Sequence, residues 1–180
     1  MKRGYLMATG KSQFTGTAGQ FYIAYGLSIR EINAAITLGN AQSVDLMASS
    51  SNGERTVSMQ VKTSRNAYRQ KRYGHEGFEW DVNKWVIGKH HESFWYAFVD
   101  LQENSGTWRP KVYFVPSLWV ANFVKSDWSR FMYFLPKTVE DITCERWDIL
   151  EGYLTGEEST IKWANEWPED KLAKWPTNTE

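Results

Sequence analysis

The sequence predicts an α/β fold: a central mixed β-sheet of four to five strands flanked by helices, with a helical C-terminal extension. Three observations predict it. Residues 44–64 have the pattern of a β-hairpin, residues 94–101 and 111–115 are strongly apolar strands, and apolar residues recur at helical spacing in residues 15–29 and 139–154. Of the 180 residues, 42% are apolar and 16% are aromatic, which indicates a folded globular chain long enough for one domain.

The domain is expected to span residues 14–154, after a loose lead-in at residues 1–13. The helix at residues 15–29 has an apolar stripe, made of Phe21, Tyr22, Ala24, Tyr25 and Ile29. A short strand is predicted at residues 34–37. Later in the chain, Ser117 is expected to cap a helix over residues 118–124, and residues 131–135 form another short apolar run.

The hairpin at residues 44–64 is the segment around which the rest is organised. Its turn is predicted at Asn52-Gly53, because both residue types tolerate positive φ. In its second strand apolar and polar residues alternate, so two sets of side chains point to opposite faces: Val57, Met59 and Val61 on one, Ser58, Gln60 and Lys62 on the other.

Three polar side chains of this hairpin are expected to converge. Gln60 and Lys62 share a face, and Asp45 lies across the hairpin, between two residues that face the core. An acid, an amide and a lysine at one place could hold a divalent cation and polarise a water molecule. Two structural interpretations remain open: Asp45 could cap a turn or pair with Lys62, and Lys62 could be a solvated strand residue.

This pattern resembles the PD-(D/E)XK nuclease superfamily. There an acid lies on one strand and an acid-x-Lys motif on the next, usually behind a helix that carries a Glu. Asp45 matches the first acid, and Gln60-Val61-Lys62 matches the second half in its familiar Gln-x-Lys form. The helix position that matches is Gln20. The resemblance covers residues 14–118 and implies a restriction-endonuclease-like core.

The resemblance also implies an activity, namely metal-dependent endonucleolytic hydrolysis of DNA phosphodiester bonds. Mg²⁺, or alternatively Mn²⁺, would be bound by the Asp45 carboxylate, the Gln60 side-chain oxygen and the Val61 carbonyl. Lys62 would position or deprotonate the attacking water, and Gln20 would orient a water or add a weak ligand. A homodimer is a further expectation, because two-ended cutting by such folds often needs two copies.

A basic segment follows the motif. Residues 55–75 contain Lys and Arg but no Asp or Glu. We expect four of its side chains to hold the DNA backbone, namely Arg65, Arg69, Lys71 and Arg72. Aromatic residues interleave with them and could stack on unpaired bases: Tyr68, Tyr73, Phe78 and Trp80. The alternative is a solvated loop whose aromatic residues pack on the core.

Two other functions remain open. With Gln at positions 20 and 60, the chain could be a catalytically inactive nuclease-like domain that binds nucleic acid or a protein partner. The acidic tail at residues 155–180 contains Trp163, Trp167 and Trp175, so it is expected to pack on the domain or on a partner and could itself be an interaction module.

The composition and patterning of the chain argue against several classes of protein. The net charge is zero, so the whole chain is not a polycation. A single cysteine, Cys144, allows no intramolecular disulfide and is expected to be a small core residue. No apolar run approaches the roughly 18 residues of a membrane span, and the N-terminus lacks the pattern of a signal peptide. Adjacent His90 and His91 lack the spacing of a metal site. We therefore expect a cytoplasmic protein that does not associate with membranes.

Overall fold

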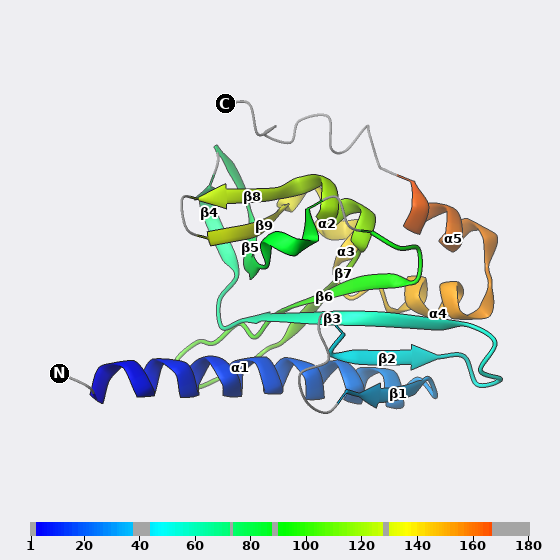
Figure 1. Ribbon diagram of the computed structural model, residues 1–180, viewed down its shortest axis with the longest axis horizontal. Coiled ribbons are helices and arrows are strands. Elements are labelled where there is room, and N and C mark those ends of the chain that lie inside the picture. The colour runs from blue at the N-terminus through cyan, green and yellow to red at the C-terminus, as the bar shows by residue number, and fades with distance from the viewer. Residues whose placement is uncertain (1–2, 38–43, 73, 88–89, 128–129, 167–180) are drawn as a thin grey trace.

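The chain forms two β-sheets that pack on one another, with helices covering the outer face of the larger sheet (Figure 1). The computed structural model describes residues 3–37, 44–72, 74–87, 90–127 and 130–166. None of the helices in these residues is long and apolar enough to cross a membrane. The expected α/β class is confirmed.

The larger sheet has five strands in the order β1-β2-β3-β6-β7. These strands are β1 (Asn33–Ile36), β2 (Leu46–Ser49), β3 (Thr56–Ser64), β6 (Phe94–Asp100) and β7 (Lys111–Pro116). The pair β3–β6 is parallel and the other three pairs are antiparallel, so the sheet is mixed as predicted. The two long apolar strands, β6 and β7, occur where their apolar runs indicated.

Helices cover one face of this sheet. They are α1 (Arg3–Ser28), α4 (Trp147–Thr155) and α5 (Glu158–Asn165). Ile23 and Leu27 of α1 are fully buried against the face that carries Val57, Met59 and Val61 of β3. The alternation in β3 therefore divides its side chains as expected, with every second residue in this core.

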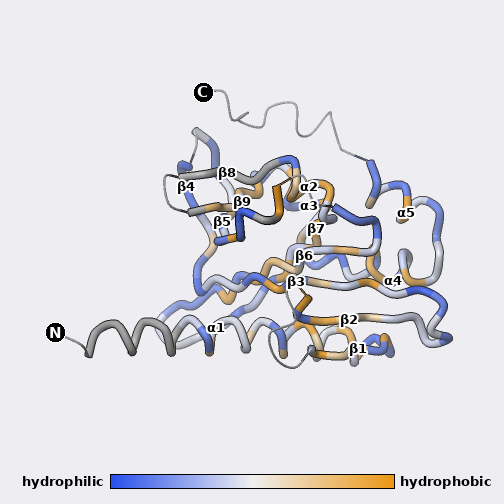
Figure 2. The backbone as a smooth tube through the Cα atoms, viewed as in Figure 1, coloured by the Kyte–Doolittle hydropathy of each residue, from blue (hydrophilic) through white to orange (hydrophobic). Residues whose placement is uncertain are grey.

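The second sheet covers the other face, in the order β4-β5-β9-β8. Its strands are β4 (Tyr68–Arg72), β5 (His75–Val82), β8 (Val124–Asp127) and β9 (Arg130–Pro136). An aromatic core lies between the sheets, where Phe98 stacks on Tyr133 with ring centroids 4.8 Å apart. Hydrophobic residues concentrate where the layers meet, whereas β4 is largely hydrophilic (Figure 2).

This second sheet was not predicted from the sequence. The sequence predicts a basic segment here, or a solvated loop whose aromatic residues pack on the core, and the structure instead has a two-stranded hairpin of β4 and β5. The signal was present in β5, where Phe78, Trp80 and Val82 alternate with Glu79 and Asp81. The charges of β4 obscured it, because an edge strand exposed on both sides has no apolar face.

The helix boundaries differ from the prediction in two places. Helix α1 begins at Arg3, so most of the expected loose lead-in is helical, since a helix once nucleated extends at little cost. The predicted helix at residues 139–154 is interrupted. The short helix α3 (Glu140–Thr143) ends before Cys144, and Glu145 has a φ of 55°, which no helix accommodates.

The apolar stripe of α1 also differs from the expectation. Phe21, Tyr25 and Ile29 are exposed, at 62%, 64% and 58%, and the helix packs on the sheet through Ile23 and Leu27 instead. Apolar residues occur on both sides of this helix, so helical spacing alone could not identify the inward side.

The hairpin turn is wider than predicted. Residues 50–55 connect β2 to β3, and within them only Gly53 has positive φ, at 74°. Ser50 closes this connection: its backbone N–H donates to Arg55 O, and its hydroxyl contacts Asn52 Oδ1 at 2.7 Å.

The start of the predicted tail packs on the domain. Trp163 of α5 lies against Trp95 and Trp119, at centroid distances of 5.8 and 5.0 Å. The indole of Trp119 also donates to Glu166 O at 3.0 Å. Trp119 belongs to helix α2 (Ser117–Phe123), which begins at the expected capping residue. Trp167 and Trp175 lie outside the described residues.

Candidate functional site

The site predicted from the hairpin lies where β2 begins beside the middle of β3. Asp45 directly precedes β2 and is held by its backbone on both sides: its N–H donates to Met59 O at 2.9 Å and its carbonyl accepts from Thr37 N at 3.1 Å. The Asp45 Oδ2 atom accepts a hydrogen bond from Val61 N–H at 2.8 Å. The carboxylate is therefore fixed against the Gln60–Lys62 segment of β3.

Gln60 and Lys62 project from the face of the large sheet that meets the second sheet. In the parallel pair β3–β6 they are the register partners of Tyr96 and Phe98, which belong to the aromatic core. Residues paired across neighbouring strands point to the same face of a sheet. The two polar side chains thus lie at the margin of an apolar layer, and both are half-buried.

The environment of Lys62 is unusual for a lysine. Burial lowers the pKa of its ammonium below the ordinary value of 10.5, and the negative charges of Asp45 and Asp81 oppose part of this shift. Within the described residues, the Lys62 ammonium makes no direct ion pair or hydrogen bond. A half-buried lysine with a lowered pKa and no direct partner can exchange a proton more readily than a solvated one.

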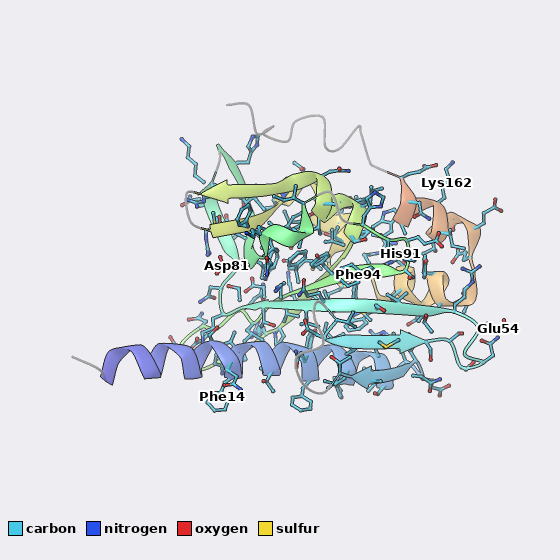
Figure 3. All side chains as sticks on the ribbon, in the orientation of Figure 1. Phe14, Glu54, Asp81, His91, Phe94 and Lys162 are labelled. Carbon is cyan, nitrogen blue, oxygen red and sulfur yellow. The ribbon has the colours of Figure 1, made fainter. Side chains whose placement is uncertain are left out.

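Asp81 is a member of this group that sequence reasoning missed. It lies near the end of β5, on the part of the second sheet that approaches β3 (Figure 3). Its charge acts on Lys62 together with that of Asp45. Asp81 could not be identified because the residue comes from a sheet that was not predicted. The alternation in β5 would have placed Asp81 on a strand, but it would not have shown that its charge acts on Lys62.

The backbone of β3 supplies a further oxygen. A strand residue points its N–H and C=O to the same side, and Val61 N–H points toward Asp45. The Val61 carbonyl therefore also points to the β2 side of β3. Val61 lies beyond the part of β3 that pairs with β2, because that pairing ends at Met59. The Gln60 side chain makes no hydrogen bond with any described residue, so its amide oxygen is available.

The oxygens of Asp45, Gln60 and Val61 are a donor set of the chemical type that a hard divalent cation binds. Together they carry little negative charge. Carboxylate, amide and carbonyl oxygens are the ligands that Mg²⁺ and Mn²⁺ accept, yet Asp45 is the single carboxylate in the set. Within the described part of the chain, no three side chains of His, Cys, Asp or Glu gather as a metal site. These donors alone would hold a divalent cation weakly, because tight binding needs more negative charge than one carboxylate supplies.

Gln20 is not brought into this group by the structure. It lies on α1, which covers the sheet face opposite to that of Gln60 and Lys62. Its side chain makes no hydrogen bond within the described residues. The arrangement gives Gln20 no observed link to Asp45 or Lys62.

The expected DNA-binding residues are mostly engaged with acids. Arg69 and Arg72 both pair with Glu79, at 3.5 and 2.8 Å. Arg65 pairs with Glu103 at 2.8 Å and lies over the ring of Trp108. Lys71 is exposed on β4 and has no ion pair with a described residue. The segment is thus less electropositive than its sequence indicates, because acids from elsewhere in the chain neutralise much of it.

The aromatic residues of the same segment divide between the core and the surface. Phe78 and Trp80 are buried, and the Trp80 indole donates to Val99 O at 2.9 Å. Tyr68 is 44% exposed and packs its ring edge on Phe78. Tyr73 lies outside the described residues. Of the four, the structure leaves Tyr68 accessible for stacking.

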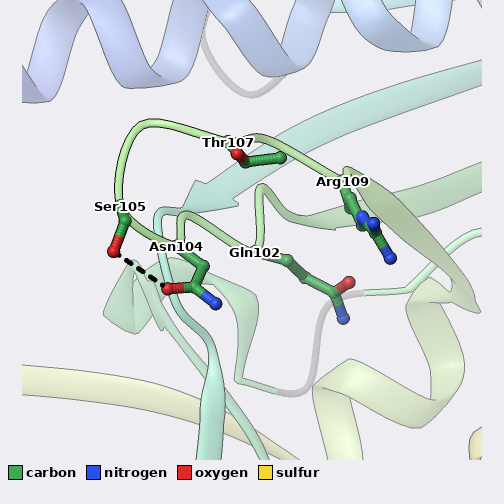
Figure 4. Close-up of a pocket in the computed structure, with 5 residues that line it drawn as sticks. All are labelled: Gln102, Asn104, Ser105, Thr107 and Arg109. Atoms are coloured by element: carbon green, nitrogen blue, oxygen red, sulfur yellow. Dashed lines mark hydrogen bonds between the residues drawn. The ribbon is translucent and has the colours of Figure 1, made fainter.

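A polar cavity of about 590 Å³ lies elsewhere, in the connection between β6 and β7 (Figure 4). It is lined by Gln102, Asn104, Ser105, Thr107 and Arg109. Ser105 and Gly106 have φ of 49° and 83°, the signature of a type I′ turn closed by the bridge from Asn104 to Thr107. This cavity contains none of the motif residues, so we do not place the candidate chemistry there.

Cys144 has the properties of a core residue. Burial raises the pKa of its thiol to about 11, which leaves little thiolate at neutral pH. It is half-buried beside the aromatic core, next to Tyr113.

Comparisons with protein-family models, with curated proteins and with solved structures find no match to this chain. The group around Lys62 is therefore interpreted from its geometry and chemistry.

Proposed function

We propose that this protein is a metal-dependent endonuclease that hydrolyses DNA phosphodiester bonds, built on a restriction-endonuclease-like arrangement. The observation that carries the proposal is the position of Lys62: half-buried, without a direct ion pair among described residues, on the strand beside Asp45 and within the field of the Asp45 and Asp81 charges. A structural lysine at this depth would normally be paired. The proposal places the protein in the cytoplasm, with DNA as its partner.

In this mechanism Asp45, Gln60 and the Val61 carbonyl would hold Mg²⁺ or Mn²⁺ against the phosphate. A divalent cation held there would lower the pKa of a bound water and would offset negative charge on the phosphate oxygens. Lys62 positions the attacking water and, with its lowered pKa, can take up and release the water's proton. The Val61 N–H fixes the orientation of the Asp45 carboxylate, so the site is ordered before substrate arrives.

Contacts with the DNA backbone would come from the exposed β4 strand, beginning with Lys71. Arg65, Arg69 and Arg72 can contribute when the phosphates displace or share the acids that now hold them. The modest positive charge of this surface supports a weak, salt-sensitive interaction rather than tight non-specific binding.

A plasmid-nicking assay with Mg²⁺ and then Mn²⁺ tests the proposal. We expect metal-dependent cutting that Lys62→Ala reduces by about 10²–10⁴-fold, the usual contribution of a proton-transferring side chain. Asp45→Asn should cause a comparable loss, because it removes the single carboxylate of the donor set. Lys162→Ala, which removes an exposed lysine of α5, is the matched control and should cut like wild type.

The second candidate is a nuclease-like domain that no longer cuts and that binds nucleic acid or a protein partner. Two observations favour it: the site has one carboxylate ligand, and Gln occupies position 60. It predicts no cutting by wild type, salt-sensitive DNA binding, and no change in that binding on Asp45→Ala. Wild-type protein that neither cuts nor binds DNA would contradict the nuclease proposal and leave a protein partner as the second candidate's remaining form.

A further inference from the structure

The outer side of α1 is an apolar surface that no described residue covers. Phe14, Phe21, Tyr25 and Ile29 are exposed at 76%, 62%, 64% and 58%. At about 100° per residue, these positions fall within roughly 80° of the helix circumference, along about 22 Å of its length. Phe14 points away from the sheet, on the outer side of the helix (Figure 3). Ile29 directly follows α1 and keeps a helical hydrogen bond, from its N–H to Tyr25 O at 3.1 Å. We call these four residues and Ala18 between them the outer stripe of α1.

The composition of α1 is that of a helix covered on both sides. Ile23 and Leu27 are buried on the sheet side, and the outer stripe is apolar on the opposite side. No Asp, Glu, Lys or Arg occurs between Lys11 and Arg30. A helix that borders water on one side normally carries charged residues there, so the outer stripe has the pattern of a buried face.

We propose that the outer stripe of α1 is the contact between two copies of this chain, paired with their α1 helices antiparallel. The spacing of the stripe supports this arrangement. In an antiparallel pair centred between Phe21 and Tyr22, Phe14 of one copy lies opposite Ile29 of the other, and Ala18 lies opposite Tyr25. Large apolar residues then meet at the two ends of the contact, and inside each end the small Ala18 faces the large Tyr25, so the rings can interdigitate.

The exposed area is close to what a dimer contact needs. Fully exposed aromatic side chains present about 150–250 Å² each, so the three rings of the stripe contribute roughly 400 Å² per copy. Two copies would bury about 800 Å² from these rings alone, before Ile29 and the smaller residues between them are counted. Specific interfaces bury about 1,200–2,000 Å² in total, so the rings supply about two thirds of the lower value and neighbouring residues must supply the rest.

The charge pattern favours a second copy over other occupants. A membrane-surface helix carries Lys and Arg beside its apolar face, and α1 has none in this segment. Two uncharged faces meet without repulsion, and the net charge of the chain is zero, so whole copies do not repel each other. The contact also leaves the group around Lys62 open, because α1 covers the other face of the sheet.

Light scattering during size-exclusion chromatography, over protein concentrations up to about 100 μM, tests the proposal. We expect a dimer for wild type and a monomer for Phe21→Glu, with the dimer dissociation constant raised at least tenfold. Because Phe21 is exposed, the substitution should not affect the core, and thermal unfolding checks this. Thr138→Glu places the same charge at an exposed position away from α1 and should remain dimeric. A monomeric wild type, or a dimer that Phe21→Glu leaves intact, overturns the proposal.

Cross-linking tests the antiparallel register separately. A variant carrying both Ala18→Cys and Tyr25→Cys should form a disulfide-linked dimer under mild oxidation. Ala18→Cys alone should not, because residues 18 of the two helices would lie about 10 Å apart along the axis, beyond the reach of a disulfide. Efficient linking by the single variant, or none by the double variant, overturns the antiparallel register. Neither result depends on nuclease activity, so this inference and the proposed function can fail independently.

Discussion

The two faces of the large sheet are built differently, although the same strand contributes to both. On the helix face, β3 presents Val57, Met59 and Val61 to a continuous apolar core. On the face toward the second sheet, the alternate residues Gln60 and Lys62 lie beside aromatic rings. The first face is built for stability, whereas the second keeps polar groups at a depth that weakens stability. Under the proposed function, the helix face supplies stability and the polar face carries the chemistry.

Substitutions on the helix face should lower the free energy of unfolding more than substitutions on the polar face. The largest effect is expected at Gly19, where α1 approaches β3 closely. A Cβ built on Gly19 would overlap Thr63 Oγ1 and would lie 3.0 Å from Thr63 Cβ, so either the Thr63 side chain or α1 must shift if Gly19 becomes Ala. We expect Gly19→Ala to lower the free energy of unfolding by about 2–3 kcal/mol, as overpacking does, and the melting temperature by about 5–10 °C.

Gly16→Ala is the matched control on the same helix. A Cβ at Gly16 meets no atom within 4 Å, so this substitution adds helix propensity and should stabilise the protein by up to about 1 kcal/mol. Equal effects of the two substitutions in thermal unfolding would contradict the close approach of α1 to β3.

The polar face should respond in the opposite sense. We expect Lys62→Met to raise the free energy of unfolding by about 1 kcal/mol at neutral pH, because it removes a charge from a partly apolar site. The same substitution should abolish any cutting. The pKa of Lys62 is lower in the folded state, so the unfolded state binds more protons in the range below 10.5. Wild-type stability therefore rises as pH rises through this range.

The advantage of Lys62→Met should accordingly shrink as pH increases from 6 toward about 10. Chemical denaturation at several pH values measures this, with Lys162→Met, at an exposed position, as the control that should show neither effect. A variant that is less stable than wild type at every pH would indicate that Lys62 acts as a structural ion-pair partner.

The sequence predicted the helix face better than the layer over the polar face. Strands β6 and β7 are long apolar runs, and the β3 alternation is strict, so local pattern was sufficient. The second sheet was missed because β4 is charged and exposed. The break after α3 was missed because apolar spacing continues through Glu145 without a Gly or Pro.

The candidate site shows the same limit. Asp45 and Lys62 belong to one hairpin, so their proximity follows from local pairing and could be predicted. The charge of Asp81 acts on Lys62 from the second sheet, through the packing of one sheet on another, which no sequence spacing encodes. Likewise, Glu79 and Glu103 pair with arginines that appeared free in the sequence, because the acids lie outside the basic segment.

The smallest effect concerns the arginines on the second sheet. Glu79 holds Arg69 and Arg72, and the arginine side chains remain more than one third exposed. Glu79→Gln should therefore cost less than about 1 kcal/mol of stability. If these arginines contact phosphates, releasing them should raise DNA affinity severalfold and steepen its decrease with salt, since each phosphate contact releases counterions. Fluorescence anisotropy with a labelled duplex at several salt concentrations measures both the DNA affinity and its dependence on salt.

Glu158→Gln on α5 is the control, because it changes the net charge equally without releasing an arginine. An equal gain in DNA affinity from both variants would reflect net charge alone. That result would assign Arg69 and Arg72 a structural role.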